Sequence, residues 1–172
     1  MSERLTTAVK MGISARQILN KARTFPDANV KNPFGLDGSH IGVEPMLLAL
    51  SMELALKAWY VFDYDKTRKR WYHDLDRIFD SLTEGSRQKL DTAFKATVAP
   101  LHPSFFCIDY GIRDVLFQHR DAFVRWRYLH ERGEPMMFER SVFEATLEMV
   151  IVEFEKRYRT EQIGVPALSR RL

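Results

Sequence analysis

Residues 44–82 constrain the fold of this chain more than any other stretch. Apolar side chains recur there at steps of three and four residues, from Leu47 through Leu54 to Val61, and therefore share one face of a helix. After the charged link DYDKTRKR, the same period resumes in residues 74–82. A short polar link between two amphipathic helices predicts an antiparallel hairpin that is buried against further helices.

Helical periodicity also runs through most of the remaining chain. No segment shows the alternation of a strand, so the sequence predicts an all-α, up-and-down bundle of five to six helices. We expect Ser86 and Asp109 to cap two of these helices, and Gly12 to weaken the first by roughly 1 kcal/mol relative to alanine. Outside the hairpin, we predict helices over residues 2–23, 86–98, 109–132 and 138–158. We predict an irregular stretch that packs on the helices over residues 24–43, and a frayed tail over residues 160–172.

Length and composition indicate one domain over residues 1–172. A hydrophobic fraction of 45% is enough for one substantial core, which we place in about residues 44–158. The helix at 138–158 is apolar over so wide an arc that it lies either at the centre of the bundle or at a subunit interface. With 26 basic and 23 acidic residues, the net charge of +3 is well short of that of a dedicated nucleic-acid binder.

Cysteine and histidine usage excludes several classes of protein. Cys107 is the only cysteine, which excludes an internal disulfide framework and a multi-cysteine metal site. The histidines never fall into the His-x-x-x-His or His-Glu-x-x-His spacing of a zinc site, so we predict neither a metal nor another cofactor. With no signal-peptide pattern and no apolar run near eighteen residues, the sequence favours the cytoplasm and no membrane contact.

Three short motifs follow one another along the chain. Residues 53–57 are ELALK, residues 73–75 are HDL, and Arg127 and Tyr128 lie within FVRWRYLHE. Over residues 44–158 this order resembles the HEPN superfamily of helical bundles. Members of that family often show a Glu-x-x-x-Lys helix, a His-Asp-Leu start and a late Arg-Tyr or Arg-x(4–6)-His motif.

The resemblance implies one of two functions. One branch of the family consists of metal-independent endoribonucleases, usually paired as homodimers. Membership of that branch would give this chain an RNA substrate and a toxin or defence role, with an antitoxin or another protein as partner. The other branch has no demonstrated chemistry and serves as a binding or interaction module for a protein or a nucleotide. The sequence leaves both functions open.

Two segments fit the Arg-x(4–6)-His pattern of the catalytic branch. Four residues separate Arg125 from His130, and five separate Arg113 from His119. In RNA cleavage the imidazole would transfer protons and the guanidinium would hold the phosphate. On a straight helix these offsets turn each arginine about 120–140° away from its histidine, so a working site needs a second subunit or a helix end inside the motif. The alternative is that both histidines are core or interface residues on an apolar stripe.

The motifs of the hairpin have structural interpretations as well. Glu53 and Lys57 are one helical turn apart, which predicts a surface ion pair worth about 0.3–0.5 kcal/mol. The alternative is that Glu53 enters a buried polar network with an arginine from the later helix. His73 is interpreted as a structural contact where the second helix begins, with a functional role as the alternative. Asp74 is interpreted as a carboxylate that complements the positive end of that helix dipole.

Two further features are interpreted as structural. We expect Arg127 and Tyr128 to tie their helix to the bundle, the guanidinium on a carboxylate and the phenol ring buried. Residues 66–70, KTRKR, could contact a phosphate backbone, but a solvated turn is favoured because acidic residues flank the run.

Overall fold

The described part of the chain is a bundle of helices. A computed structural model describes residues 3–25, 42–68, 71–103, 109–128 and 137–163. Every regular element in these ranges is a helix, so the predicted all-α bundle is confirmed. The helices are α1 (Glu3–Ala22), α2 (Val43–Tyr64), α3 (Leu75–Asp80), α4 (Glu84–Thr97), α5 (Ile112–Gln118), α6 (Ala122–Arg127) and α7 (Arg140–Ile163).

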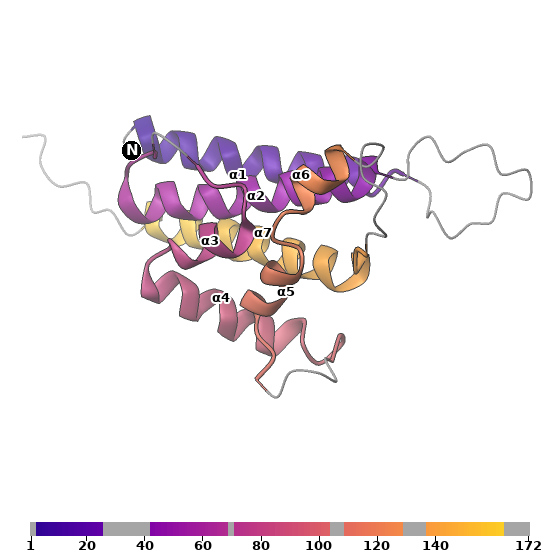
Figure 1. The fold of residues 1–172 in the computed structure, drawn as a ribbon. Coiled ribbons are helices and arrows are strands. Elements are labelled where there is room, and N and C mark those ends of the chain that lie inside the picture. The colour runs from indigo at the N-terminus through magenta and orange to yellow at the C-terminus, as the bar shows by residue number, and fades with distance from the viewer. Residues whose placement is uncertain (1–2, 26–41, 69–70, 104–108, 129–136, 164–172) are drawn as a thin grey trace, which may run out of the picture.

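Four long helices form the body of the bundle (Figure 1). α1 and α2 run antiparallel side by side, α4 is antiparallel to α7, and α7 is parallel to α2. Two polar contacts join the parallel pair. Trp59 Nε1 on α2 donates to the carbonyl of Val150 on α7 at 3.2 Å, and Glu44 pairs with Arg140 at 2.7 Å. The short helices α3 and α6 pack on α2, while α5 packs on α3, α4 and α7.

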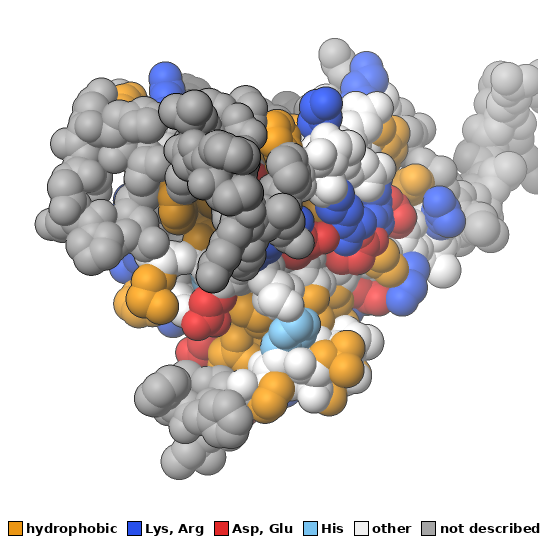
Figure 2. All heavy atoms as spheres, turned by 90° about the vertical axis from the view of Figure 1, so that its right-hand side faces the viewer, with side chains coloured by type: hydrophobic (Ala, Val, Ile, Leu, Met, Phe, Trp, Pro, Cys, Tyr) orange, Lys and Arg blue, Asp and Glu red, His pale blue; other side chains and the backbone are white. Residues whose placement is uncertain are grey.

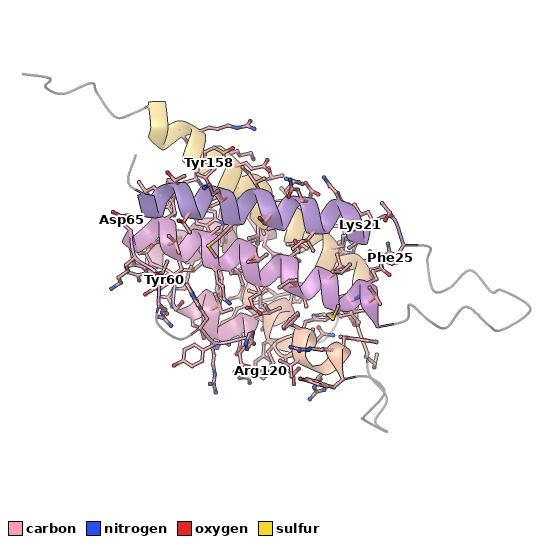
Figure 3. All side chains as sticks on the ribbon, turned by 90° about the horizontal axis from the view of Figure 1, so that it is seen from above. Lys21, Phe25, Tyr60, Asp65, Arg120 and Tyr158 are labelled. Atoms are coloured by element: carbon pink, nitrogen blue, oxygen red, sulfur yellow. The ribbon has the colours of Figure 1, made fainter. Side chains whose placement is uncertain are left out.

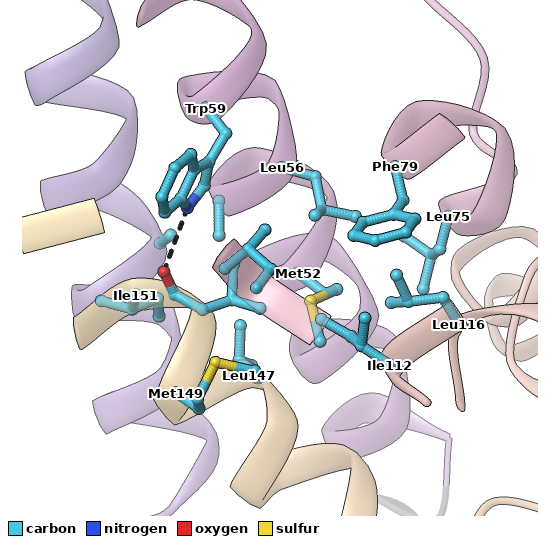
Figure 4. Packing of buried hydrophobic residues seen from close by; sticks show 14 of the residues in the cluster. Met52, Leu56, Trp59, Leu75, Phe79, Ile112, Leu116, Leu147, Met149 and Ile151 are labelled. Carbon is cyan, nitrogen blue, oxygen red and sulfur yellow. Dashed lines mark hydrogen bonds between the residues drawn. The ribbon is translucent and has the colours of Figure 1, made fainter. Parts of the chain in front are cut away.

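The core lies around α2, which is enclosed by other helices (Figure 4). Met52, Leu56 and Trp59 of this helix are fully buried. α7 also contacts four other helices, so the wide apolar arc predicted for it belongs to a central helix. The side chains that enclose the core with those of α2 include Leu75, Phe79, Ile112, Leu116, Leu147 and Ile151.

α2 is long and apolar enough to cross a membrane if only length and composition are considered. It therefore departs from the expectation that no apolar run approaches eighteen residues. In the structure, however, 67% of its most apolar window is buried inside the bundle. The core accounts for the apolar sequence of this helix.

Gly12 allows α1 to approach α7 closely. A Cβ atom at this position would lie 2.7 Å from Cε1 of Phe154, far inside the normal contact distance. The ring of Phe154 is buried and packs edge-on against Trp59 and Phe62, with centroids at 6.0 Å and 5.7 Å. The glycine that was expected to weaken α1 is thus required by the packing of two helices.

The helix predicted at residues 109–132 is divided into α5 and α6, which corrects that prediction. The carbonyl of Arg120 accepts the N–H of Leu75 at 3.0 Å, so it bonds to the start of α3 instead of to its own helix. His119 ends α5 and Ala122 begins α6. A contact from a distant segment therefore interrupts a continuous helical pattern.

Two predicted caps are also corrected. α4 begins after Thr83, whose hydroxyl accepts the N–H of Ser86 at 3.4 Å. Asp109 does not cap a helix but pairs with Lys95 at 2.8 Å. α5 begins instead after Gly111, whose N–H donates to the carboxylate three residues later at 2.9 Å.

α7 extends beyond the predicted helix end. It runs to Ile163, so the start of the tail predicted at residues 160–172 is helical. The remainder of that tail, residues 26–41 of the predicted irregular stretch, and Cys107 lie outside the described residues.

Candidate functional site

His119 is a buried residue whose two ring nitrogens are both bound. Nδ1 donates to the carbonyl of Val115 at 2.9 Å, and Nε2 accepts the N–H of Glu139 at 3.1 Å. The centroids of the Phe138 and Phe143 rings each lie 4.9 Å from the centroid of the His119 ring. Burial lowers the pKa of His119. These bonds require a neutral imidazole, and no ring nitrogen is left to serve a substrate.

Arg113 pairs with a carboxylate on another helix and not with His119. Its guanidinium donates two parallel hydrogen bonds to Asp80 on α3, both of 2.9 Å, and these bonds raise the pKa of Arg113. His119 faces α7 instead, through Phe143. The structure therefore does not bring Arg113 and His119 together.

The second predicted pair lies partly outside the described residues. Arg125 Nε donates to Asp121 at 2.6 Å in an exposed pair within α6. His130 is not among the described residues, so catalysis by this pair stays a prediction. Arg127 stacks over the ring of Tyr128 at 5.4 Å, and that ring is exposed where burial had been expected.

Glu53 and Lys57 form a buried ion pair, which corrects the predicted surface pair. Their residues are 4% and 9% exposed. The second oxygen of Glu53 lies 3.1 Å from Nδ1 of His73, in the link that precedes α3. The carboxylate thus enters a buried network as the alternative interpretation proposed, but its partner is a histidine and not an arginine from a later helix.

His73 occupies the boundary between this network and solvent. Its ring stacks on Phe123 of α6, with centroids 5.8 Å apart and planes at 28°. The side chain remains 54% exposed. The next residue, Asp74, occupies the N-cap position of α3 without a capping hydrogen bond from its side chain, and its carboxylate accepts Arg77 and Arg120 at 3.1 Å and 3.3 Å.

A surface of aromatic and basic side chains adjoins this network at the C-terminal end of α2. Tyr60 packs on Tyr64 and on Trp71, with centroids 4.7 Å and 5.1 Å apart. Figure 3 shows this end of α2, where Tyr60 and Asp65 are labelled. We call the surface the α2–α3 corner, and its members are Tyr60, Tyr64, Lys66, Arg68, Trp71 and Tyr72.

Cations lie over the rings of the α2–α3 corner. Arg68 is 4.6 Å from the centroid of Tyr60, and Lys66 is 5.3 Å from that of Tyr64. The Lys57 ammonium lies 5.2 Å from the ring of Trp71, which joins the buried ion pair to the corner. Within the described part of the chain, no carboxylate lies within ion-pairing distance of Lys66 or Arg68, in contrast to Arg113.

A groove on another part of the described structure has a different character. It has a volume of about 590 Å³ and lies between α7 and the ends of α1 and α4. The two cationic side chains in its described lining are paired, Arg23 with Glu144 and Lys156 with Glu153, both at 2.7 Å. The end of the molecule seen in Figure 2 mixes acidic, basic and apolar side chains. The groove therefore lacks the unpaired cations that a phosphate backbone requires.

No protein family, no curated protein and no solved structure matches this chain.

Proposed function

We propose that this chain is a HEPN-like helical protein that binds single-stranded RNA at the α2–α3 corner, in the cytoplasm. The observation that carries the proposal is the interleaving of closely packed aromatic rings with cations that have no carboxylate partner among the described residues. Unstacked bases pack on aromatic side chains, and cations follow the phosphate backbone. This combination favours single strands, because the bases of a duplex are already stacked on each other.

The exposed rings supply the stacking surface. Tyr64 and Tyr72 are 39% and 50% exposed, and neither residue belongs to the hydrophobic core cluster. Arg77 lies over Tyr72 at 5.7 Å, which adds a further cation beside that ring. The mild net charge of the chain does not oppose the proposal, because the relevant charge is local to the corner.

The proposal predicts a loss of RNA affinity when the exposed ring is removed. Binding of a fluorescently labelled 20-nucleotide mixed-sequence RNA would be measured by anisotropy at several salt concentrations. Tyr72→Ala should weaken binding by about 1–3 kcal/mol, which is roughly 5- to 150-fold in Kd. Tyr128→Ala removes a tyrosine at the end of α6 that is 39% exposed and also lies beside an arginine, and this variant should leave Kd within about twofold.

Charge removal gives a second readout of the same surface. The double variant Lys66→Ala/Arg68→Ala should reduce the slope of log K against log salt by about 1.4, since each phosphate contact contributes about 0.7 on a single strand. Lys21→Ala/Arg127→Ala removes the same charge elsewhere on the surface and should leave the slope unchanged. Equal losses in the two double variants would show that the binding is not located at the corner.

A further inference from the structure

The geometry of His73 differs from that of His119 in one decisive respect. The Glu53 carboxylate lies beside Nδ1 of His73, while no described residue hydrogen-bonds Nε2. A carboxylate that accepts Nδ1–H fixes the tautomer in which Nε2 carries a lone pair. The stacking contact with Phe123 fixes the plane of the ring. The result is an oriented imidazole, 54% exposed, whose Nε2 has no hydrogen-bond partner among the described residues.

Glu53 is buried, whereas His73 is open to solvent. The glutamate side chain is 5% exposed whereas that of His73 is 54% exposed, so the carboxylate lies behind the imidazole as seen from solvent. Lys57 compensates the buried negative charge of Glu53 in an ion pair. A proton acceptor held by a second group and open to a substrate is the arrangement that general base catalysis requires.

We propose that His73 is the proton-transfer residue of an RNA cleavage reaction at the α2–α3 corner, with Glu53 as its positioning residue. The inference rests on the proposed function, because the RNA held by the corner is the substrate. Continuous contacts join the two: Glu53 pairs with Lys57, and the Lys57 ammonium lies over the ring of Trp71 within the corner.

The reaction is an internal transfer of the phosphoryl group. Nε2 of His73 accepts the proton of a ribose 2′-hydroxyl, and the 2′-oxygen forms a bond to the adjacent phosphorus. The bond from phosphorus to the 5′-oxygen of the next nucleotide breaks. The imidazolium then returns its proton to that 5′-oxygen. The products are a 2′,3′-cyclic phosphate and a 5′-hydroxyl, and the neutral imidazole is restored.

The test separates binding from cleavage on one substrate. The wild-type protein and His73→Ala would be incubated in EDTA with the labelled 20-nucleotide RNA, and with a copy in which every ribose is replaced by deoxyribose. Anisotropy gives Kd, and gel analysis gives the cleavage rate and the product ends. His73→Ala should bind RNA within about twofold of wild type but cleave it about 10²–10⁴-fold more slowly. The deoxyribose copy should not be cleaved.

Further variants distinguish a role in chemistry from a structural one. His73→Gln keeps a polar side chain and should be as slow as His73→Ala, whereas His102→Ala, at the groove beside α7, should cleave at the wild-type rate. Glu53→Gln should lower the cleavage rate, and the double variant with His73→Ala should be no slower than His73→Ala alone, because Glu53 acts through the imidazole.

Each failure has its own meaning. Wild-type protein that binds the RNA without cleaving it, or His73 variants that cleave at the wild-type rate, would overturn the catalytic role and leave the proposed function in place. Wild-type protein that does not bind the RNA would overturn both.

Discussion

The buried imidazole of His119 makes the stability of the protein depend on pH. Burial lowers its pKa in the folded state, whereas in the unfolded chain it has the ordinary value of 6.5. Below that value the unfolded chain binds a proton that the folded protein does not, so unfolding becomes easier as pH falls. The contribution of the neutral His119 to the free energy of unfolding is therefore fully present above about pH 6.5, and it is lost as the pH falls from there toward the folded-state pKa.

We expect the midpoint of thermal unfolding to fall between about pH 7.5 and pH 5.5, a window above the titration of ordinary carboxylates. Circular dichroism at 222 nm measures this midpoint. His119→Gln should be less stable at every pH, because it loses bonds to Val115 and Glu139, and its midpoint should change less across the window. His102→Gln is the control and should keep the wild-type slope. An unchanged slope in His119→Gln would contradict the prediction.

The network around Glu53 shows what residue spacing can predict. The helical period alone places Glu53 beside Lys57, and that pairing follows from four residues of sequence. Its burial does not follow, because it depends on how the link before α3 folds back along α2 and brings His73 to the same carboxylate. The aromatic residues of the α2–α3 corner were visible around the KTRKR run, but only the structure shows that their rings lie beneath those cations.

At the scale of helices, the contact between α1 and α7 gives a test of packing against propensity. Alanine favours a helix over glycine by about 1 kcal/mol. At Gly12, however, the new methyl group would meet the buried ring of Phe154, and overpacking costs about 1–3 kcal/mol. We therefore expect Gly12→Ala to lower the free energy of unfolding by up to about 2 kcal/mol, measured by urea denaturation.

Gly85 provides a matched control on another helix. A Cβ atom there would meet nothing within 4 Å, so Gly85→Ala should be neutral or stabilising by up to about 1 kcal/mol. If both variants changed stability alike, the close approach of α1 and α7 would not determine the choice of glycine.

Helix boundaries mark the limit of sequence-based prediction at this scale. The periodic stripe through residues 109–132 correctly predicts buried side chains such as Ile112 and Leu116, although it indicates one helix where there are two. It cannot reveal the break, because the break results from the hydrogen bond between Arg120 and Leu75, which are 45 positions apart. The N-cap of α4 is likewise three residues earlier than predicted, at Thr83, since Thr83 and Ser86 both carry a hydroxyl group that suits this position.

For the whole molecule, the order of long helices follows from the apolar patterns, but their mutual attachment does not. Asp63 at the end of α2 is the centre of one such attachment. Its carboxylate accepts Arg157 of α7 at 2.6 Å, the hydroxyl of Ser86 at 2.7 Å and the N–H of Thr83 at 3.0 Å. Three of the four long helices therefore meet at one buried negative charge, and no local sequence motif predicts this contact.

Breaking this attachment should destabilise the whole bundle. The Asp63 side chain is 1% exposed, so Arg157→Met would leave a buried carboxylate without its cation, a change that costs about 3–5 kcal/mol. Lys156→Met removes the neighbouring charge from the same helix, but its pair with Glu153 is exposed and should cost less than about 1 kcal/mol. Urea denaturation followed by tryptophan fluorescence compares the two, because Trp59 lies 5.0 Å from the Arg157 guanidinium. Equal losses in both variants would show that the three helices are not held together at Asp63, whereas a cooperative transition at lower urea in Arg157→Met alone would place their common attachment there.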